Sequence, residues 1–249
     1  MIVGYEKIRE RIGTFTWEGS GAPFESRCEA LLAAVDDALI EACSEFSGPV
    51  HMACSGGVDS TLLMYRAAAL SYPVVAHVMC VDPGHADFQH CSRAVSRAPG
   101  HEVYLRPHFV ERQAVDAYHV LMGLIGRETG RVVCGDCIDE LQGGYYSHQD
   151  GGRPEFQSRL ERLIPEHLQH LERESTAADV LVHLPFASPG VMAACSAFLP
   201  EELVRQGDVS ARKLSLMAVA RMAGVDEENL IRRKLGLVSW QNAAPKSPT

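Results

Sequence analysis

The chain has 249 residues, of which 46% are hydrophobic, so it can bury a full core and fits one domain of α/β size or one domain with a small appendage. Its net charge of −9 and its lack of a Lys/Arg block argue against a large nucleic-acid surface, and a tRNA substrate is disfavoured. No apolar run approaches the ~20 residues that span a bilayer, and the first residues lack a basic segment followed by an apolar one. These features predict a cytoplasmic protein without a membrane partner.

Residues 1–27 mix Gly, Ser, Pro and aromatic residues without clear periodicity. We assign them to an N-terminal extension, with a short hairpin as its expected form. Residues 28–43 follow with apolar side chains at helical spacing, which predicts an amphipathic helix.

Strands and helices then alternate along the chain. Val74 to Met79 is an uninterrupted apolar run with one histidine, as expected for a strand buried on both faces of a parallel sheet. The predicted series is strand 49–53, a helix to about residue 70, strand 74–79, helix 87–97, strand 101–105, helix 110–125 and strand 131–134. This alternation predicts an α/β fold with a doubly wound parallel sheet and ligands outside the carboxyl ends of its strands.

Beyond Gly151-Gly152-Arg153-Pro154 the pattern changes to helices, at about 155–173, 189–198, 211–223 and 226–234. One domain is therefore expected over 28–238, with a mainly helical portion from about residue 155. The tail at 239–249 is expected to be disordered.

The stretch Cys54-Ser55-Gly56-Gly57-Val58-Asp59-Ser60 predicts a strand end, a tight glycine turn and a helix start. Adjacent glycines let the backbone approach an anion closely, and the first turn of the helix offers unpaired N–H groups and a positive dipole end. The hydroxyls of Ser55 and Ser60 add donors. Asp59 would repel phosphate unless a hard cation such as Mg²⁺ bridges them, so the loop predicts a nucleotide with magnesium. A Gly-Gly turn capped by Ser and Asp, without a ligand, is the alternative.

A second polar stretch follows the fourth predicted strand. It reads Gly135-Asp136-Cys137-Ile138-Asp139-Glu140-Leu141-Gln142-Gly143-Gly144-Tyr145-Tyr146. Because both stretches come at the carboxyl ends of predicted parallel strands, Asp139 is placed to share a metal ion with Asp59.

These two stretches resemble those of a known family, in the family's order. The first is similar to the Ser-Gly-Gly-x-Asp-Ser loop of the PP-loop ATP pyrophosphatases, and the second to the Gly-Asp-Gly-x-Asp-Glu-Leu-x-Gly-Gly-Tyr segment of the synthetase domain of asparagine synthetases. A third part resembles that family's carboxyl-terminal pattern, in which two lysines face the nucleotide: Leu199-Pro200-Glu201, Arg212-Lys213-Leu214 and Ile231-Arg232-Arg233-Lys234-Leu235-Gly236. Together the matches span roughly residues 30–238.

The resemblance implies an ATP-dependent, AMP-forming ligase that requires Mg²⁺. Such an enzyme adenylates a small-molecule carboxylate or amide, a nitrogen nucleophile displaces AMP, and pyrophosphate is released; related members close β-lactam rings or cyclise peptides. It implies that Ser55, Gly56, Gly57 and Ser60 hold pyrophosphate, that Asp59 and Asp139 bind magnesium, and that backbone near Val78, Gly135 and Asp136 contacts adenine and ribose. It also implies that Lys213 contacts pyrophosphate and that Lys234 stabilises charge near the α-phosphate. The alternative for both lysines is a solvated position on a helix.

The sequence also departs from the family. Residue 2 is Ile, where asparagine synthetases carry an amino-terminal cysteine nucleophile on a glutaminase domain, so we expect no glutaminase activity. Nitrogen would come from ammonia, an amine substrate, an intramolecular amine or a separate glutaminase subunit. The family's acceptor segment, Glu-x-Arg-x-Pro-Phe-Leu-Asp, corresponds to Leu181-Val182-His183-Leu184-Pro185-Phe186-Ala187-Ser188, which lacks the charge pair and disfavours asparagine as product. A homo-oligomer and a partner subunit stay open.

The eight cysteines and several histidines leave other functions open. Cys134-Gly135-Asp136-Cys137 forms a C-x-x-C pair, and Cys54 adjoins the glycine loop, so a sulfur-inserting enzyme with a persulfide or a cluster, with Cys195 as a third ligand, is an alternative. Zinc at these thiols and a catalytically silent nucleotide-binding partner are further alternatives. Buried, unligated thiols are the expected state. No metal is assigned to the pairs His167 with His170 or His85 with His90.

Overall fold

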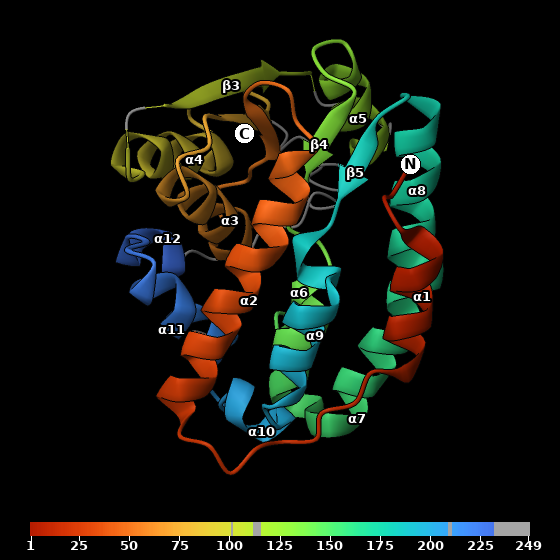
Figure 1. Ribbon diagram of the computed structural model, residues 1–249, viewed down its shortest axis with the longest axis vertical. Coiled ribbons are helices and arrows are strands. Elements are labelled where there is room, and N and C mark those ends of the chain that lie inside the picture. The colour runs from red at the N-terminus through yellow and green to blue at the C-terminus, as the bar shows by residue number, and fades with distance from the viewer. Residues whose placement is uncertain (101, 112–115, 209–210, 232–249) are drawn as a thin grey trace, which may run out of the picture.

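The computed structural model describes residues 1–100, 102–111, 116–208 and 211–231 (Figure 1). Within these residues five strands form one sheet, all parallel, in the order β3-β2-β1-β4-β5. The strands are β1 (Val50–Ala53), β2 (Val74–Cys80), β3 (Val103–Phe109), β4 (Arg131–Val133) and β5 (Leu181–His183). The predicted α/β class with a parallel sheet is confirmed.

The strand order reverses at the middle of the sheet. The chain builds β1, β2 and β3 outward to one edge and then returns to place β4 and β5 on the other side of β1. The direction of the strand order therefore changes between β1 and β4, and the segments that follow these two strands begin next to each other at the carboxyl end of the sheet. In open α/β sheets this switch point is where ligands bind.

Helices flank the sheet along the described chain. Helix α3 packs on β1 and β2, α4 on β2 and β3, α8 on β5, and α5 against α8. Their bounds are α1 (Tyr5–Thr14), α2 (Phe24–Ser44), α3 (Val58–Ala69), α4 (Ala86–Arg97), α5 (Ala117–Gly126), α6 (Ile138–Gln142), α7 (Ser147–Arg162), the π-helix η1 (Leu163–Leu168), α8 (Gln169–Ala177), the 3-10 helix η2 (Pro185–Ala187), α9 (Pro189–Ser196), α10 (Pro200–Leu203), α11 (Leu214–Met222) and α12 (Glu227–Leu230). No helix among these residues is long and apolar enough to cross a membrane.

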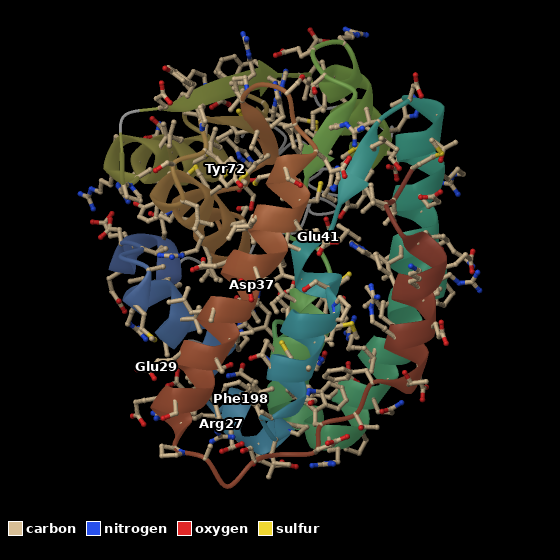
Figure 2. The ribbon with its side chains drawn as sticks, in the orientation of Figure 1. Arg27, Glu29, Asp37, Glu41, Tyr72 and Phe198 are labelled. Atoms are coloured by element: carbon tan, nitrogen blue, oxygen red, sulfur yellow. The ribbon has the colours of Figure 1, made fainter. Side chains whose placement is uncertain are left out.

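Helix α2 follows its predicted amphipathic pattern. Leu31, Val35 and Leu39 are fully buried, whereas Glu29, Asp37 and Glu41 lie on the exposed face. Figure 2 shows these acidic side chains along the outside of the helix. The helix joins the core because one stripe is apolar and the opposite face is charged.

The N-terminal extension does not form the expected hairpin. It contains helix α1, and Ile2 makes a parallel bridge with Val182 of β5. Ile8, Ile12 and Trp17 are buried in the same core as the sheet, and α1 runs along η1 and α8 (Figure 1). Since α2 already begins at Phe24, the helix crosses the predicted boundary between residues 27 and 28. The extension is thus packed on the domain.

Other elements also differ from the prediction in their bounds or their presence. Strand β3 continues through Pro107 to Phe109, because β3 is an edge strand, where a residue without an N–H group is tolerated. Helix α5 begins only at Ala117, where the Asp116 side chain caps it. Strand β5 was not predicted, since three residues are too few to show a periodic pattern. Of the helix predicted at 226–234, α12 covers 227–230, and residues 232–234 lie outside the described chain, as does the tail.

Candidate functional site

The glycine loop lies where the sequence predicts, between β1 and α3. Gly56 has φ +70°, and a Cβ atom there would lie 2.5 Å from the backbone nitrogen of Cys91. Both facts require glycine at this position. The N-terminus of α3 has Gly57 as its N-cap and no side-chain cap, so its dipole end faces the loop. The Gly57 N–H donates to Ser55 Oγ at 3.3 Å.

Ser60 shapes this loop from inside. Its hydroxyl is buried, donates to the Gly57 carbonyl at 3.3 Å and accepts the Ser55 N–H at 3.3 Å. The predicted contact of Ser60 with pyrophosphate therefore stays a prediction, and its observed contacts are within the loop itself.

A buried lysine joins the two predicted magnesium ligands. Lys213 Nζ lies 2.5 Å from Asp59 Oδ1 and 2.5 Å from Asp139 Oδ1, so these two oxygens are no more than about 5 Å apart. Side chains from three segments far apart in the sequence thus meet at the carboxyl ends of β1 and β4. All three are largely buried, with side-chain exposures of 7% for Lys213, 19% for Asp59 and 17% for Asp139.

Electrostatics keeps this lysine charged. Burial opposes the charge, but the carboxylates of Asp139 and Asp59 outweigh it and raise the pKa of Lys213 above its ordinary value. Lys213 also has φ +53°, a left-handed conformation that costs about 1–2 kcal/mol for a residue with a Cβ atom. Such strain is typical of functional sites.

Two glycines of the second motif lie at the ionic cluster. A Cβ atom at Gly144 would overlap the Asp139 carboxylate and lie 2.7 Å from Lys213 Cε, so only glycine leaves room for the cluster there. A Cβ atom at Gly135 would lie 3.4 Å from the Asp59 Cβ and from the Ser60 nitrogen, which is an ordinary contact distance. The β4 loop thus lies against the start of α3.

This donor set fits Mg²⁺ with a nucleotide. Two carboxylates at the switch point, next to a helix N-terminus and a glycine loop, are the groups that bind magnesium together with phosphate oxygens. Lys213 supplies a cation that can also contact phosphate. The residues present therefore suit both partners of the predicted complex.

A second ionic cluster adjoins the first through the same β4 loop. Asp136 Oδ1 accepts a hydrogen bond from Tyr118 at 2.8 Å and lies 2.7 Å from His167 Nε2. Burial lowers the pKa of His167, but the Asp136 carboxylate outweighs this and raises it to about 8. For Asp136, burial raises the pKa and the bonds to His167 and Tyr118 prevail to lower it. An Asp-His pair of this kind can hold or move a proton near neutral pH.

No sequence motif indicated that His167 would pair with Asp136. His167 lies in the π-helix η1, which also contains Pro165, a residue that cannot donate the usual helix hydrogen bond. An interrupted helix carrying a histidine was the available signal. His167 and Tyr118 both contact Oδ1 of Asp136, and the predicted contact of Asp136 with the nucleotide stays a prediction.

Asn229 links the carboxyl-terminal helices to the glycine loop. Its Nδ2 donates to the Gly56 carbonyl at 2.9 Å and to the His90 carbonyl at 3.1 Å, and its side chain is buried. The residue lies in α12, a few positions before the predicted catalytic Lys234. Lys234 itself lies outside the described residues.

The remaining predicted contacts are with backbone. Val78 is fully buried in β2, close to the carboxyl end of that strand. The acceptor-like segment 181–188 forms β5 and η2 and is largely buried, with His183 at 5% exposure. A segment in this position contributes to the core, and it holds no charge pair for an amino-acid acceptor.

The cysteines are all buried, and none of them forms a disulfide. Burial raises the pKa of Cys134 and of Cys137. A thiol that reacts as a nucleophile usually has a lowered pKa, so these two thiols give no support to the sulfur-inserting alternative. In the part of the chain that the structure describes, the one group of three or more metal-ligating side chains contains no cysteine.

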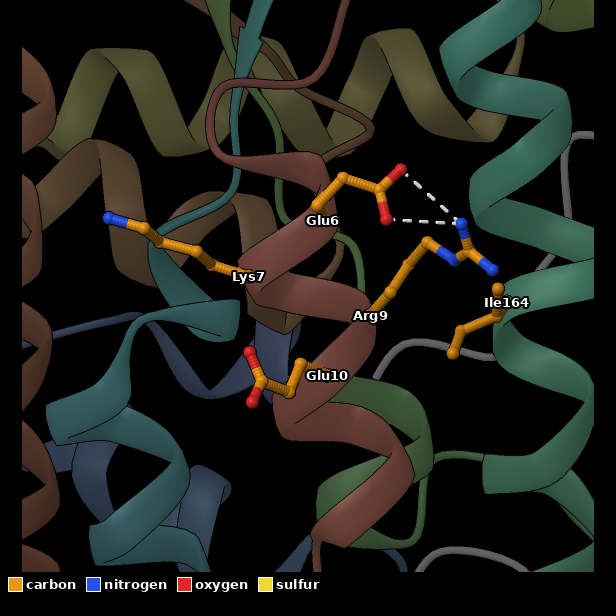
Figure 3. A pocket seen from close by; sticks show the side chains of 5 residues that line it. All are labelled: Glu6, Lys7, Arg9, Glu10 and Ile164. Carbon is orange, nitrogen blue, oxygen red and sulfur yellow. Dashed lines mark hydrogen bonds and ion pairs between the residues drawn. The ribbon is translucent and has the colours of Figure 1, made fainter.

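An open surface pocket lies elsewhere, between α1 and η1. Figure 3 shows its lining side chains, with the exposed ion pair of Glu6 and Arg9 on one rim and Ile164 opposite. None of the lining residues belongs to the site at the switch point.

Comparison with known proteins adds no relative: no protein-family model and no curated protein matches this chain. The functional argument therefore depends on the motifs and on the geometry of the site.

Proposed function

We propose that this protein is an ATP-dependent ligase of the PP-loop, asparagine synthetase-like type, which adenylates a small-molecule carboxylate or amide and lets a nitrogen nucleophile displace AMP. The observation that carries the proposal is the meeting of Asp59, Asp139 and Lys213 beside a glycine loop at the switch point of a parallel sheet. Magnesium-bound ATP would supply the α-phosphorus that the carboxylate attacks and the pyrophosphate that leaves.

Each group of the site has a role in this proposal. The loop backbone at Gly56 and Gly57 and the N-terminus of α3 would bind the leaving pyrophosphate. Asp59 and Asp139 would hold the magnesium ion, and Lys213 would turn from the carboxylates toward phosphate oxygens. Val78 in β2 and Gly135 after β4 belong to the two strands that flank β1, and their backbone would border the adenosine.

The Asp136–His167 pair would serve the nitrogen nucleophile. An amine must lose a proton as it attacks an acyl-adenylate, and a histidine with a pKa of about 8 can accept it. Asp136 holds Nε2 and leaves Nδ1 as the exchanging nitrogen, which is the logic of Asp-His pairs in other enzymes. The nitrogen would come from ammonia, an amine substrate, an intramolecular amine or a separate subunit.

Asp59→Asn tests the proposal, with Asp37→Asn as its matched control on the exposed face of α2. Carboxylates and amines would be screened for ATP-dependent pyrophosphate release, with mass spectrometry of products and calorimetry of Mg²⁺–ATP binding. We expect Asp59→Asn and Asp139→Asn to abolish release while both variants stay folded, and Asp37→Asn to behave as wild type. Wild-type pyrophosphate release by Asp59→Asn would refute the magnesium assignment. Tight Mg²⁺–ATP binding without turnover across the screen would favour a silent nucleotide-binding subunit.

Lys234→Ala tests the charge-stabilising role taken from the resemblance. A fixed cation beside the developing charge typically contributes ~2.7–4 kcal/mol, or roughly a hundredfold to a thousandfold in rate. We expect that loss in ATP–pyrophosphate exchange with little change in ATP affinity. A normal rate of ATP–pyrophosphate exchange in Lys234→Ala would favour the alternative, in which Lys234 is a solvated lysine on a helix.

A further inference from the structure

A row of three histidines crosses one face of the sheet. In the strand register His51 of β1 is opposite Val75, and His77 of β2 is opposite Arg106, while His108 of β3 is opposite Met79. Since alternate residues of a strand share a face, His51, His77 and His108 point to the same side of β1, β2 and β3. Each is the diagonal neighbour of the next, within reach for side-chain contact.

The imidazole rings are in direct contact. His51 Nδ1 lies 2.7 Å from His77 Nε2, and His77 Nδ1 lies 2.8 Å from His108 Nε2. The rings of His77 and His108 are nearly parallel, with an interplanar angle of 6°. His77, in the middle of the row, is 1% exposed, whereas His51 and His108 at its two ends are partly exposed.

A carboxylate completes a potential ligand set. One ligand atom each of His77, His108 and Glu128 lies within 4.8 Å of the other two. Glu128 comes from the turn after α5 and is oriented by an ion pair with Arg106 at 2.9 Å. A carboxylate has a second oxygen, so this ion pair can persist when a metal is bound.

We propose that His77, His108 and Glu128 bind one divalent transition-metal ion of the zinc type, with His51 as a positioning residue. Two imidazole nitrogens and one carboxylate oxygen are a zinc ligand set, whereas Mg²⁺ prefers oxygen ligands alone. Tetrahedral coordination at Zn–N distances of ~2.0–2.1 Å separates two nitrogens by about 3.3 Å, so the rings of His77 and His108 need to move apart by about 0.5 Å.

The surroundings already provide the ligand form of the rings. A histidine binds metal as the neutral imidazole. Burial, together with the other histidines and Arg106, lowers the pKa of His77 to about 3, and burial lowers that of His51 and His108 as well. When His77 Nε2–H donates to His51, the lone pair of Nδ1 faces His108, as in metal sites where a partner fixes the ligand tautomer.

Such an ion would stabilise the position of the edge strand β3 in the sheet. It would tie β2, the edge strand β3 and the turn before β4 through side chains that come from three separate segments. Its fourth position would face the exposed side and take water. The site shares no residue with the cluster of Asp59, Asp139 and Lys213, and its test measures metal binding in the absence of ATP.

The test uses the full chain with any affinity tag removed and the metal stripped by a chelator. Co²⁺ is added first, because tetrahedral cobalt gives visible absorption, and Zn²⁺ is then titrated by competition and calorimetry. We expect one ion per chain, and at a hundredfold excess over Kd a rise in melting temperature of about 5–10 °C.

His108→Ala should weaken Zn²⁺ binding at least a hundredfold, and His51→Ala about tenfold through misorientation of His77. His108 and Glu128 are chosen because neither is fully buried, so both variants should fold. Glu128→Gln should weaken binding and alter the cobalt spectrum. The matched control is His119→Ala, since His119 is an exposed histidine of α5 that contacts Glu174. Absence of any ion at micromolar Zn²⁺, or equal binding by wild type and His108→Ala, would overturn the proposal.

Discussion

We call the cluster of Asp59, Asp139 and Lys213 at the carboxyl ends of β1 and β4 the acidic edge, and the row of His51, His77 and His108 the histidine face. These two regions bury polar groups in opposite ways. At the edge, the carboxylates of Asp59 and Asp139 keep Lys213 charged. On the face, His51, His77 and His108 are rings of lowered pKa that satisfy one another by hydrogen bonds. Removing Lys213 leaves two carboxylates without their cation, whereas removing a histidine leaves an unpaired dipole. Uncompensated charge is the more expensive of the two.

This difference has a functional meaning. If Mg²⁺ took the place of the lysine cation between the two carboxylates, its two positive charges would balance theirs, and Lys213 could then contact phosphate. A neutral row has no charge to exchange and instead offers lone pairs, which suit a transition metal. The same sheet would thus bind a hard ion with its substrate at one place and a softer ion at another.

The largest expected effect comes from removing the central cation of the edge. Lys213→Met should lower the free energy of unfolding by about 3–5 kcal/mol, because two buried carboxylates lose their partner. Added Mg²⁺ should restore much of this loss, since the ion can occupy the position between Asp59 and Asp139. Denaturant unfolding with and without Mg²⁺ measures both effects.

The control for this variant is Lys7→Met, which removes an exposed lysine of α1. It should change stability by less than about 0.5 kcal/mol and show no dependence on Mg²⁺. If Mg²⁺ failed to stabilise Lys213→Met more than wild type, the two aspartates would not form a magnesium site.

A smaller effect is expected from crowding the same cluster. Gly144→Ala places a methyl group against Asp139 and Lys213, and overpacking of this kind costs about 1–3 kcal/mol. Nucleotide affinity should fall as well, because the carboxylate must move. Gly123→Ala, in the interior of α5 with open space around it, should instead be neutral or stabilising by up to about 1 kcal/mol. Equal stability of the two variants, measured by thermal unfolding, would contradict the close approach at Gly144.

The edge could be predicted from sequence because its parts are local motifs. Gly56 and Gly144 mark close approaches, and Asp59 and Asp139 each follow a strand, so parallel-sheet topology alone brings them together. The third member, Lys213, was located only by resemblance, since nothing local to it indicates a partner more than seventy residues away. The strand and helix order of the sheet up to β4 was likewise readable from hydrophobic periodicity.

The face could not be predicted, because it depends on strand register. His51, His77 and His108 meet only if β1, β2 and β3 pair in one particular alignment, and a shift by one residue would separate them. The pair of Asp136 with His167 was missed for a related reason, as it requires the π-helical turn of η1. Strand β5 was not predicted because it is too short to show a periodic pattern. Helix α1 was not predicted because its segment has only weak hydrophobic periodicity.

The smallest expected effect is the pH dependence of stability at the His167–Asp136 pair, which adjoins the acidic edge and tests whether a buried histidine there is charged. His167 has its pKa raised from 6.5 to about 8, so its contribution to stability is fully present below pH 6.5 and is lost as the pH rises through 8. The shift corresponds to about 2 kcal/mol at most, and less in practice because 31% of the side chain is exposed to solvent. The stability difference between wild type and His167→Gln should therefore shrink by up to about 2 kcal/mol between pH 6 and pH 9. His119→Gln, an exposed control, should show a smaller change.

If His167 also accepts the proton of the nitrogen nucleophile, kcat/KM of the wild type should rise over the pH range in which this stability is lost, and His167→Gln should lose that rise. A stability difference that stays constant from pH 6 to pH 9 would show that His167 is not held charged by Asp136, and the role of the pair as a base would fall with it.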